Sequence, residues 1–63
     1  MYRLYIRKDG KDVSKKLFNY WNDVKEAYPN LKFKKNRDLG RYEATDGAHD
    51  YHLYELIIIG SGF

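Results

Sequence analysis

The segment at residues 51–59 constrains the fold of this chain more than any other. It is the most apolar part of the sequence, is rich in β-branched and aromatic residues, and is followed by Gly60, a composition that predicts a β-strand. A strand with one solvent-facing side alternates apolar and polar residues, but residues 56–59 are all apolar. Both faces of this strand therefore need cover. A single helix covers one face of a small sheet, so we expect a partner to cover the other.

The size of the chain supports the same expectation. With 63 residues we expect one domain, residues 1–63, and a chain this short buries only about 60% of the surface that it exposes when unfolded. Folds of this size are commonly supported by disulfides, metals or oligomerisation. The chain has no cysteine, which excludes disulfides and thiolate metal sites. Association with a partner is the support that remains.

Charge and hydropathy limit the location and the partners. No apolar run is long enough for a signal peptide or a membrane span, so we expect a cytoplasmic protein that does not bind membranes. The sequence has twelve Lys and Arg and nine Asp and Glu, which gives a net charge of +3. This mildly basic balance permits nucleic-acid binding without requiring it.

The first predicted strand covers residues 2–7 and has a period of two. One face carries Tyr2, Leu4 and Ile6, and the other carries Arg3, Tyr5 and Arg7. We expect the first set to enter the core. The second set would form a basic and aromatic stripe that faces outwards, before a turn at Asp9 and Gly10.

A helix is predicted over residues 13–28. Val13, Leu17, Trp21, Val24 and Tyr28 follow one another in steps of three or four residues, which forms one apolar stripe on a helix, and we expect this stripe to pack in the core. Asp12, or alternatively Ser14, is the expected N-cap. Pro29 ends the helix, because proline lacks an amide hydrogen and restricts the preceding residue.

Further strands are predicted at residues 31–35, 41–45 and 51–59, separated by loops that contain Gly40 and Gly47. Leu31 and Phe33 share one face of the second strand, with Lys32 and Lys34 on the other. In the third strand, one face carries Tyr42 and Ala44, and the other carries Arg41, Glu43 and Thr45. In the last strand, one face carries His52, Tyr54, Leu56 and Ile58, and the other carries Leu53, Glu55, Ile57 and Ile59. The resulting order is β-α-β-β-β. We therefore predict an α+β fold with one mostly antiparallel sheet and one amphipathic helix packed on one face.

Two histidines and two nearby carboxylates raise the question of metal binding or catalysis. His49, His52, Asp46 and Asp50 are suitable ligand types, but residues three apart in a strand point to opposite faces. Acid–base catalysis, as in a small nuclease toxin, needs paired groups around a cleft, which a domain of this size seldom provides. We therefore expect no metal, no other cofactor and no enzymatic activity.

The sheet face away from the helix is the predicted binding surface. Its expected residues are Arg3, Tyr5, Arg7, Lys32, Lys34, Tyr54, Leu56 and Ile58. Tyr and Arg are enriched in protein-interface hot spots, and an uncovered apolar strand marks an association site. The leading hypothesis is a small non-enzymatic protein that binds and occludes a macromolecular partner, such as a phage-type inhibitor or regulator. A homodimer through the last strand belongs to the same hypothesis.

Nucleic acid is the alternative partner. Tyrosine rings interleaved with Arg and Lys suit single-stranded DNA or RNA, whose bases stack on aromatic rings while phosphates meet the cations. This second hypothesis predicts binding that tolerates many sequences and weakens steeply with salt.

Overall fold

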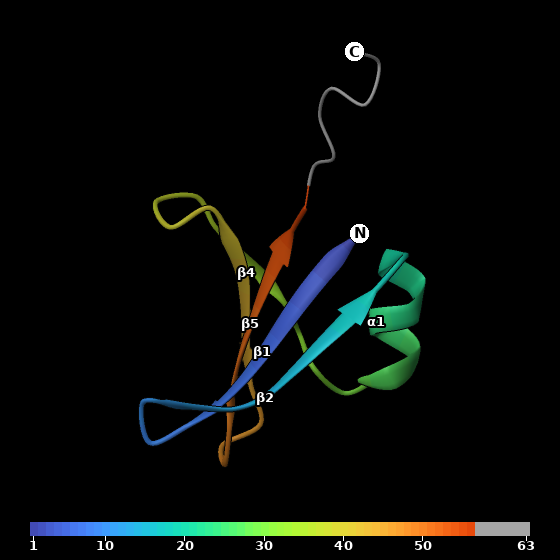
Figure 1. Cartoon of the computed structure of the whole chain (residues 1–63). Helices are drawn as coiled ribbons and strands as arrows, with labels where there is room; N and C mark the ends of the chain where they lie inside the picture. Colours follow the sequence, from blue (N-terminus) through green and yellow to red (C-terminus); the bar gives the residue numbers. More distant parts are fainter. Residues whose placement is uncertain (57–63) are drawn as a thin grey trace.

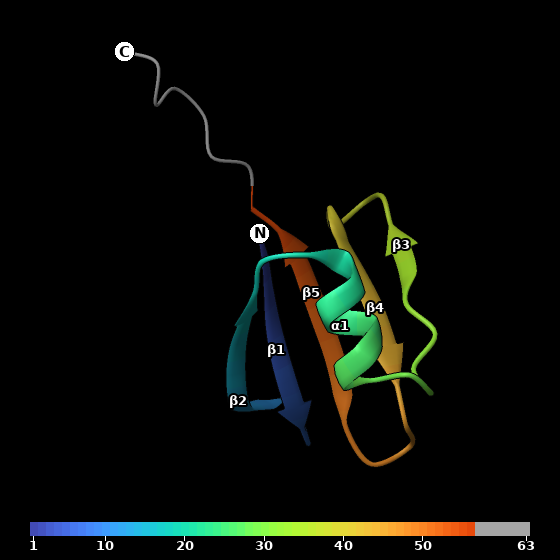
Figure 2. The same ribbon diagram turned by 90° about the vertical axis from the view of Figure 1, so that its right-hand side faces the viewer.

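In the computed structural model, which describes residues 1–56, five strands form a single sheet and one helix lies across one of its faces (Figure 1). Every pair of neighbouring strands is antiparallel, and the order across the sheet is β2-β1-β5-β4-β3 (Figure 2). The elements are β1 (Tyr2–Lys8), β2 (Lys11–Phe18), α1 (Trp21–Ala27), β3 (Lys34–Asn36), β4 (Arg41–Thr45) and β5 (Asp50–Glu55). The predicted α+β class, with one antiparallel sheet and one helix, is confirmed.

The first two strands form a hairpin, which corrects the expected element order. Lys8 pairs with Lys11, and both residues of the turn between them have positive φ: 54° at Asp9 and 78° at Gly10. This geometry matches a two-residue turn whose twist suits antiparallel strands. The first half of the predicted helix is therefore a strand, and Asp12 and Ser14 lie within β2 rather than at a helix N-cap.

The helix is short and depends on its packing. It begins after Tyr20, whose side chain makes no capping hydrogen bond, and it ends at Tyr28, before Pro29, where the Tyr28 amide donates to the Val24 carbonyl at 3.0 Å. Isolated helices of this length are unstable in water, so contacts with the sheet must stabilise it. Within residues 1–56, no helix combines the length and the apolar character needed to cross a membrane.

The core lies between α1 and the two central strands. Leu4 of β1, Val24 of α1 and Leu53 of β5 are fully buried, and Tyr51 is nearly so. The Trp21 ring packs against Tyr2, Phe33 and Tyr42. The predicted core roles of Trp21 and Val24 are thus confirmed.

Val13 and Leu17 do not join this core, although the helical stripe assigned them to it. Both lie on β2, and 56% and 58% of their respective surfaces are exposed. Their spacing of four residues fits a helix, but it equally fits the period of two of a strand. The Asp9–Gly10 hairpin turn decides between the two readings.

The remaining strands follow the prediction with shifted ends. β4 has the predicted bounds, whereas β3 begins only at Lys34, after Leu31 and Phe33 have packed against the core. β5 ends at Glu55. The apolar residues 57–59, on which the expected need for a partner depended, lie outside the described part of the chain, and that expectation stays a prediction.

Candidate binding surface

The sheet face that α1 leaves uncovered is called the open face here, and strand register fixes which side chains share it. Arg3 pairs with Leu17 on β2 and with Tyr54 on β5, and Tyr5 pairs with Lys15 and His52. The row continues outwards from His52 to Glu43 and then to Lys34. The open face thus carries Arg3, Tyr5, Arg7, Asp12, Lys15, Leu17, Lys34, Asn36, Arg41, Glu43, Thr45, Asp50, His52 and Tyr54.

Aromatic side chains occupy the middle of the open face. The Tyr5 and Tyr54 rings, on the adjacent strands β1 and β5, meet edge to face with centroids 5.7 Å apart and planes at 86°. His52 is half-buried beside them. Burial and, second, the positive charge of Arg41 lower the pKa of His52, so this imidazole is neutral at pH 7. The centre of the open face is therefore aromatic and uncharged.

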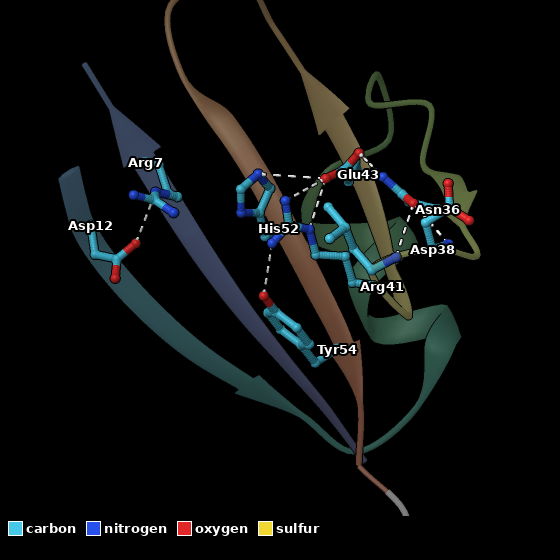
Figure 3. Close-up of polar contacts among 9 residues, drawn as sticks. Arg7, Asp12, Asn36, Asp38, Arg41, Glu43, His52 and Tyr54 are labelled. Atoms are coloured by element: carbon cyan, nitrogen blue, oxygen red, sulfur yellow. Dashed lines mark hydrogen bonds and ion pairs between the residues drawn. The ribbon is translucent and has the colours of Figure 1, made fainter. Parts of the chain in front are cut away.

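Arg41 joins β4 to β5 through a hydrogen-bonded network (Figure 3). Its Nε and Nη2 each lie 2.7 Å from Glu43 Oε2, and its Nη1 donates to the Tyr54 hydroxyl at 3.0 Å. Asn36 Nδ2 donates to Glu43 Oε1 at 3.1 Å. Hydrogen bonds from Asn36 and then from Arg41 lower the pKa of Glu43. The network neutralises Arg41 and fixes the Tyr54 ring.

Arg7 is also paired. Its Nε lies 3.2 Å from Asp12 Oδ1, and its Nη2 donates to the Gly10 carbonyl at 2.6 Å. The contact links the end of β1 to the start of β2 and to the turn between them. Arg7 and Arg41 are thus both neutralised within the chain.

Arg3 differs from these arginines. Its Nε is buried and has no hydrogen-bond partner among residues 1–56. On either side of it, by strand register, lie Leu17 of β2 and Tyr54 of β5. Arg3 is therefore a cation with an apolar and an aromatic neighbour on the adjacent strands, and its Nε donor is unpaired within residues 1–56.

Two depressions lie on the open face. The first has a volume of about 450 Å³ and is lined by Arg3, Tyr5, Arg7, Asp12, His52, Tyr54, Glu55 and Leu56. The second, of about 590 Å³, is lined by Asn30, Lys32, Lys34, Glu43, Ala44, Thr45, Asp50 and His52. His52 lines both, so the two depressions adjoin across β5.

The structure brings most of the predicted binding residues together. Arg3, Tyr5, Arg7, Tyr54 and Leu56 line the first depression, where the Leu56 amide donates to the Met1 carbonyl at 2.8 Å. Lys32 and Lys34 line the second. Ile58 lies outside the described residues. Whether these residues bind anything stays a prediction.

Sequence reasoning missed the contribution of β4. The alternation of residues 41–45 placed Arg41 and Glu43 on one face, but it did not show that this face adjoins Tyr54. The strand order determines that contact, because β4 lies beside β5. His52 was also left out of the predicted binding set, although it shared a strand face with Tyr54.

The Asp46 carboxylate stabilises the loop between β4 and β5. Asp46 accepts hydrogen bonds from the Tyr51 hydroxyl at 2.7 Å and from the backbone amides of His49 and Ala48. These bonds, the Tyr51 one first, lower the pKa of Asp46 to about 2. Among residues 1–56, no three His, Cys, Asp or Glu side chains gather in a way that would hold a metal ion.

Comparison of the chain with protein families, curated proteins and solved structures finds no match.

Proposed function

We propose that this chain is a non-enzymatic binding protein that docks its open face on another protein and occludes the surface that it covers. The observation that supports this most is the composition of that face: Tyr5, Tyr54 and His52 at the centre, surrounded by arginines. Tyrosine and arginine are the residue types that supply much of the energy in protein interfaces.

Pre-organisation supports the same proposal. Arg41 is held by Glu43 and in turn holds the Tyr54 hydroxyl, and Arg7 is held by Asp12. Side chains that are fixed before association lose less conformational entropy on binding. Tyr54 and Arg7 of the open face are therefore already held in position when a partner binds.

The charge pattern favours a protein over nucleic acid. A phosphate backbone is bound by cations that exchange their counterions for phosphates, but Arg7 and Arg41 are already neutralised by carboxylates. Asp50 places a further negative charge between Arg7 and Thr45 in the same row of the sheet. Mixed charges of this kind suit the polar rim of a protein interface.

Occlusion by a small inhibitor or regulator of the phage type would use this face directly. Self-association is a variant in which the partner is a second copy. The sequence predicts that self-association would involve Ile58 of the last strand. A dilution series by sedimentation velocity on the full chain distinguishes self-association from binding to another protein.

The test compares substitutions on and off the open face. A partner is first captured from a native-host lysate on the immobilised full chain and is then purified, so that affinity is measured between two known components by calorimetry. Tyr5→Ala should weaken binding by about 30-fold or more, as expected for an interfacial hot spot. The control is Tyr20→Ala, an exposed tyrosine at the start of α1, which should bind like the wild type.

Equal losses in both variants, or a loss only in Tyr20→Ala, would place the interface elsewhere and contradict the proposal. The nucleic-acid alternative has its own signature. Binding of an oligothymidylate or oligouridylate that weakens steeply with salt, with no protein partner that depends on Tyr5, would replace the proposed function by that alternative.

A further inference from the structure

Arg3, on the open face, has a buried donor without a hydrogen-bond partner among residues 1–56. A guanidinium group has five N–H donors and no acceptor, and a buried donor without a partner destabilises the folded chain. The Arg3 Nε is in that position among residues 1–56. Arg3 also lines the first depression and forms no ion pair within these residues, so its guanidinium charge favours a ligand there that supplies negatively charged acceptor oxygens.

The carboxylates nearby do not fill this role. Asp12 and Glu55 line the same depression, but Asp12 pairs with Arg7, and no ion pair joins Glu55 to Arg3 within the described residues. The chain therefore neutralises two arginines of this face and leaves the third without an acceptor from residues 1–56.

The surroundings of Arg3 indicate what accompanies the charge. Leu17 is 58% exposed on one side, Tyr54 flanks the other, and Leu56 lines the same depression. Leu17 is exposed, and Tyr54 and Leu56 are partly exposed, so these surfaces suit an aliphatic or aromatic side chain next to the anion.

We propose that Arg3 receives a side-chain carboxylate from an acidic and apolar segment of the protein partner, with an apolar neighbour of that carboxylate seated against Leu17, Tyr54 and Leu56. The inference rests on the proposed function and specifies the chemistry of its partner. Arginine and carboxylate form paired, charge-assisted hydrogen bonds with matching geometry.

A carboxylate fits the depression better than a phosphate. Asp12 and Glu55 line it, and like charges repel, so a group with one negative charge is opposed less than a phosphate monoester with up to two. His52 adds no compensating charge, because its pKa is lowered by burial and by Arg41.

Nuclear magnetic resonance on the full ¹⁵N-labelled chain provides the test, because the Arg3 Nε–H group gives its own signal. The probe is a capped hexapeptide of alternating leucine and glutamate, and the matched control peptide has glutamine in place of glutamate. The glutamate peptide should shift the Arg3 Nε–H signal and the Tyr54 amide, and the glutamine peptide should bind at least about tenfold more weakly.

Substitutions in the chain complete the design. Arg3→Gln should weaken binding of the glutamate peptide by at least about tenfold, and Arg3→Lys should restore only part of the affinity, since lysine lacks the paired donors. Lys25→Gln removes one positive charge from an exposed position of α1, which covers the other face of the sheet, and should change the affinity by less than about threefold. Thermal melts of each variant confirm that it is folded.

Several results would overturn the inference. They are equal binding of both peptides, no Arg3 shift at millimolar peptide, or tighter binding of an oligothymidylate with the same Arg3 shift. If the captured partner depends on Tyr5 but not on Arg3, the proposed function stands and this inference fails.

Discussion

The Arg41 guanidinium donates to the Tyr54 hydroxyl at 3.0 Å, so a charged side chain of β4 fixes an aromatic side chain of β5 on the open face. The same guanidinium is held by Glu43 at 2.7 Å. The position of Tyr54 therefore depends on a carboxylate that it does not contact. This coupling gives the open face its shape before any partner binds.

The Glu43 network should make stability sensitive to acid. Because hydrogen bonds from Asn36 and Arg41 lower the pKa of Glu43 below its ordinary 4.5, the stabilisation is fully present above pH 4.5 and is lost as the pH falls through the lower, folded-state pKa. Glu43→Gln should therefore unfold at a lower temperature than the wild type at pH 7, and the difference should narrow on acidification. Thermal melts from pH 7 to pH 2 measure both. Glu26→Gln, on the exposed side of α1, is the control, and an equal effect there would contradict the assignment.

Substitution should destabilise the chain much more at Val24 than at Leu17, although both residues belong to the apolar stripe of the sequence. Val24 is fully buried, so Val24→Ala should destabilise the chain by about 2 kcal/mol through lost burial and a residual cavity. Leu17→Thr keeps a residue suited to strands at an exposed position and should change stability by less than about 0.5 kcal/mol. Urea denaturation measures both. A large loss at Leu17 would instead support a helix over residues 13–28.

The exposed position of Leu17 on β2 shows where prediction of the fold from the sequence failed. The period of two correctly divided residues 2–7 and 41–45 into two faces. In each strand one face packs against the core and the other is the open face. Val13 and Leu17 were misassigned, since a spacing of four satisfies both a strand and a helix. The turn at Asp9 and Gly10 was the signal that decides for a strand, and it was interpreted only as a break.

Gly10 should be needed for the β1–β2 hairpin. Its φ of 78° lies in the left-handed region, and a Cβ there would meet no heavy atom within 4 Å, so the cost of a substitution is confined to the backbone. Gly10→Ala should therefore destabilise the chain by about 1–2 kcal/mol. A synthetic chain with D-alanine at this position should match or exceed the wild-type stability, because D-residues favour positive φ. Equal stability of the L- and D-alanine chains, by thermal melts, would contradict the turn assignment.

The hydrogen bond between Tyr51 and Asp46 should make the stability of the chain depend on pH in both acid and alkali. It raises the pKa of Tyr51 to about 12 and, as the largest cause, lowers that of Asp46 to about 2. The Asp46 contribution to stability is present above pH 3.8 and is lost as the pH falls towards 2. The Tyr51 contribution is present below pH 10 and is lost as the pH rises towards 12.

Tyr51→Phe should therefore raise the pKa of Asp46 towards its ordinary 3.8, which carboxyl ¹³C titration measures directly. Tyr5→Phe is the control, since its hydroxyl lies on the opposite face from Tyr51. An unchanged Asp46 titration in Tyr51→Phe would show that the backbone amides of the loop are sufficient.

The candidate site was only partly predictable, for a topological reason. Alternation along β1 placed Arg3, Tyr5 and Arg7 on one face without reference to the rest of the chain. Their neighbours depend on β1 lying beside β5, a pairing between segments far apart in the sequence. No local pattern shows that Arg3 lies next to Tyr54, or that Arg41 reaches the same ring.

The central claim is that the open face is the binding surface, and chemical-shift mapping of the full ¹⁵N-labelled chain with its purified partner tests it most directly. The account predicts that the largest changes fall on Arg3, Tyr5, His52 and Tyr54, with α1 nearly unchanged. Changes concentrated on α1, with the open face undisturbed, would contradict it.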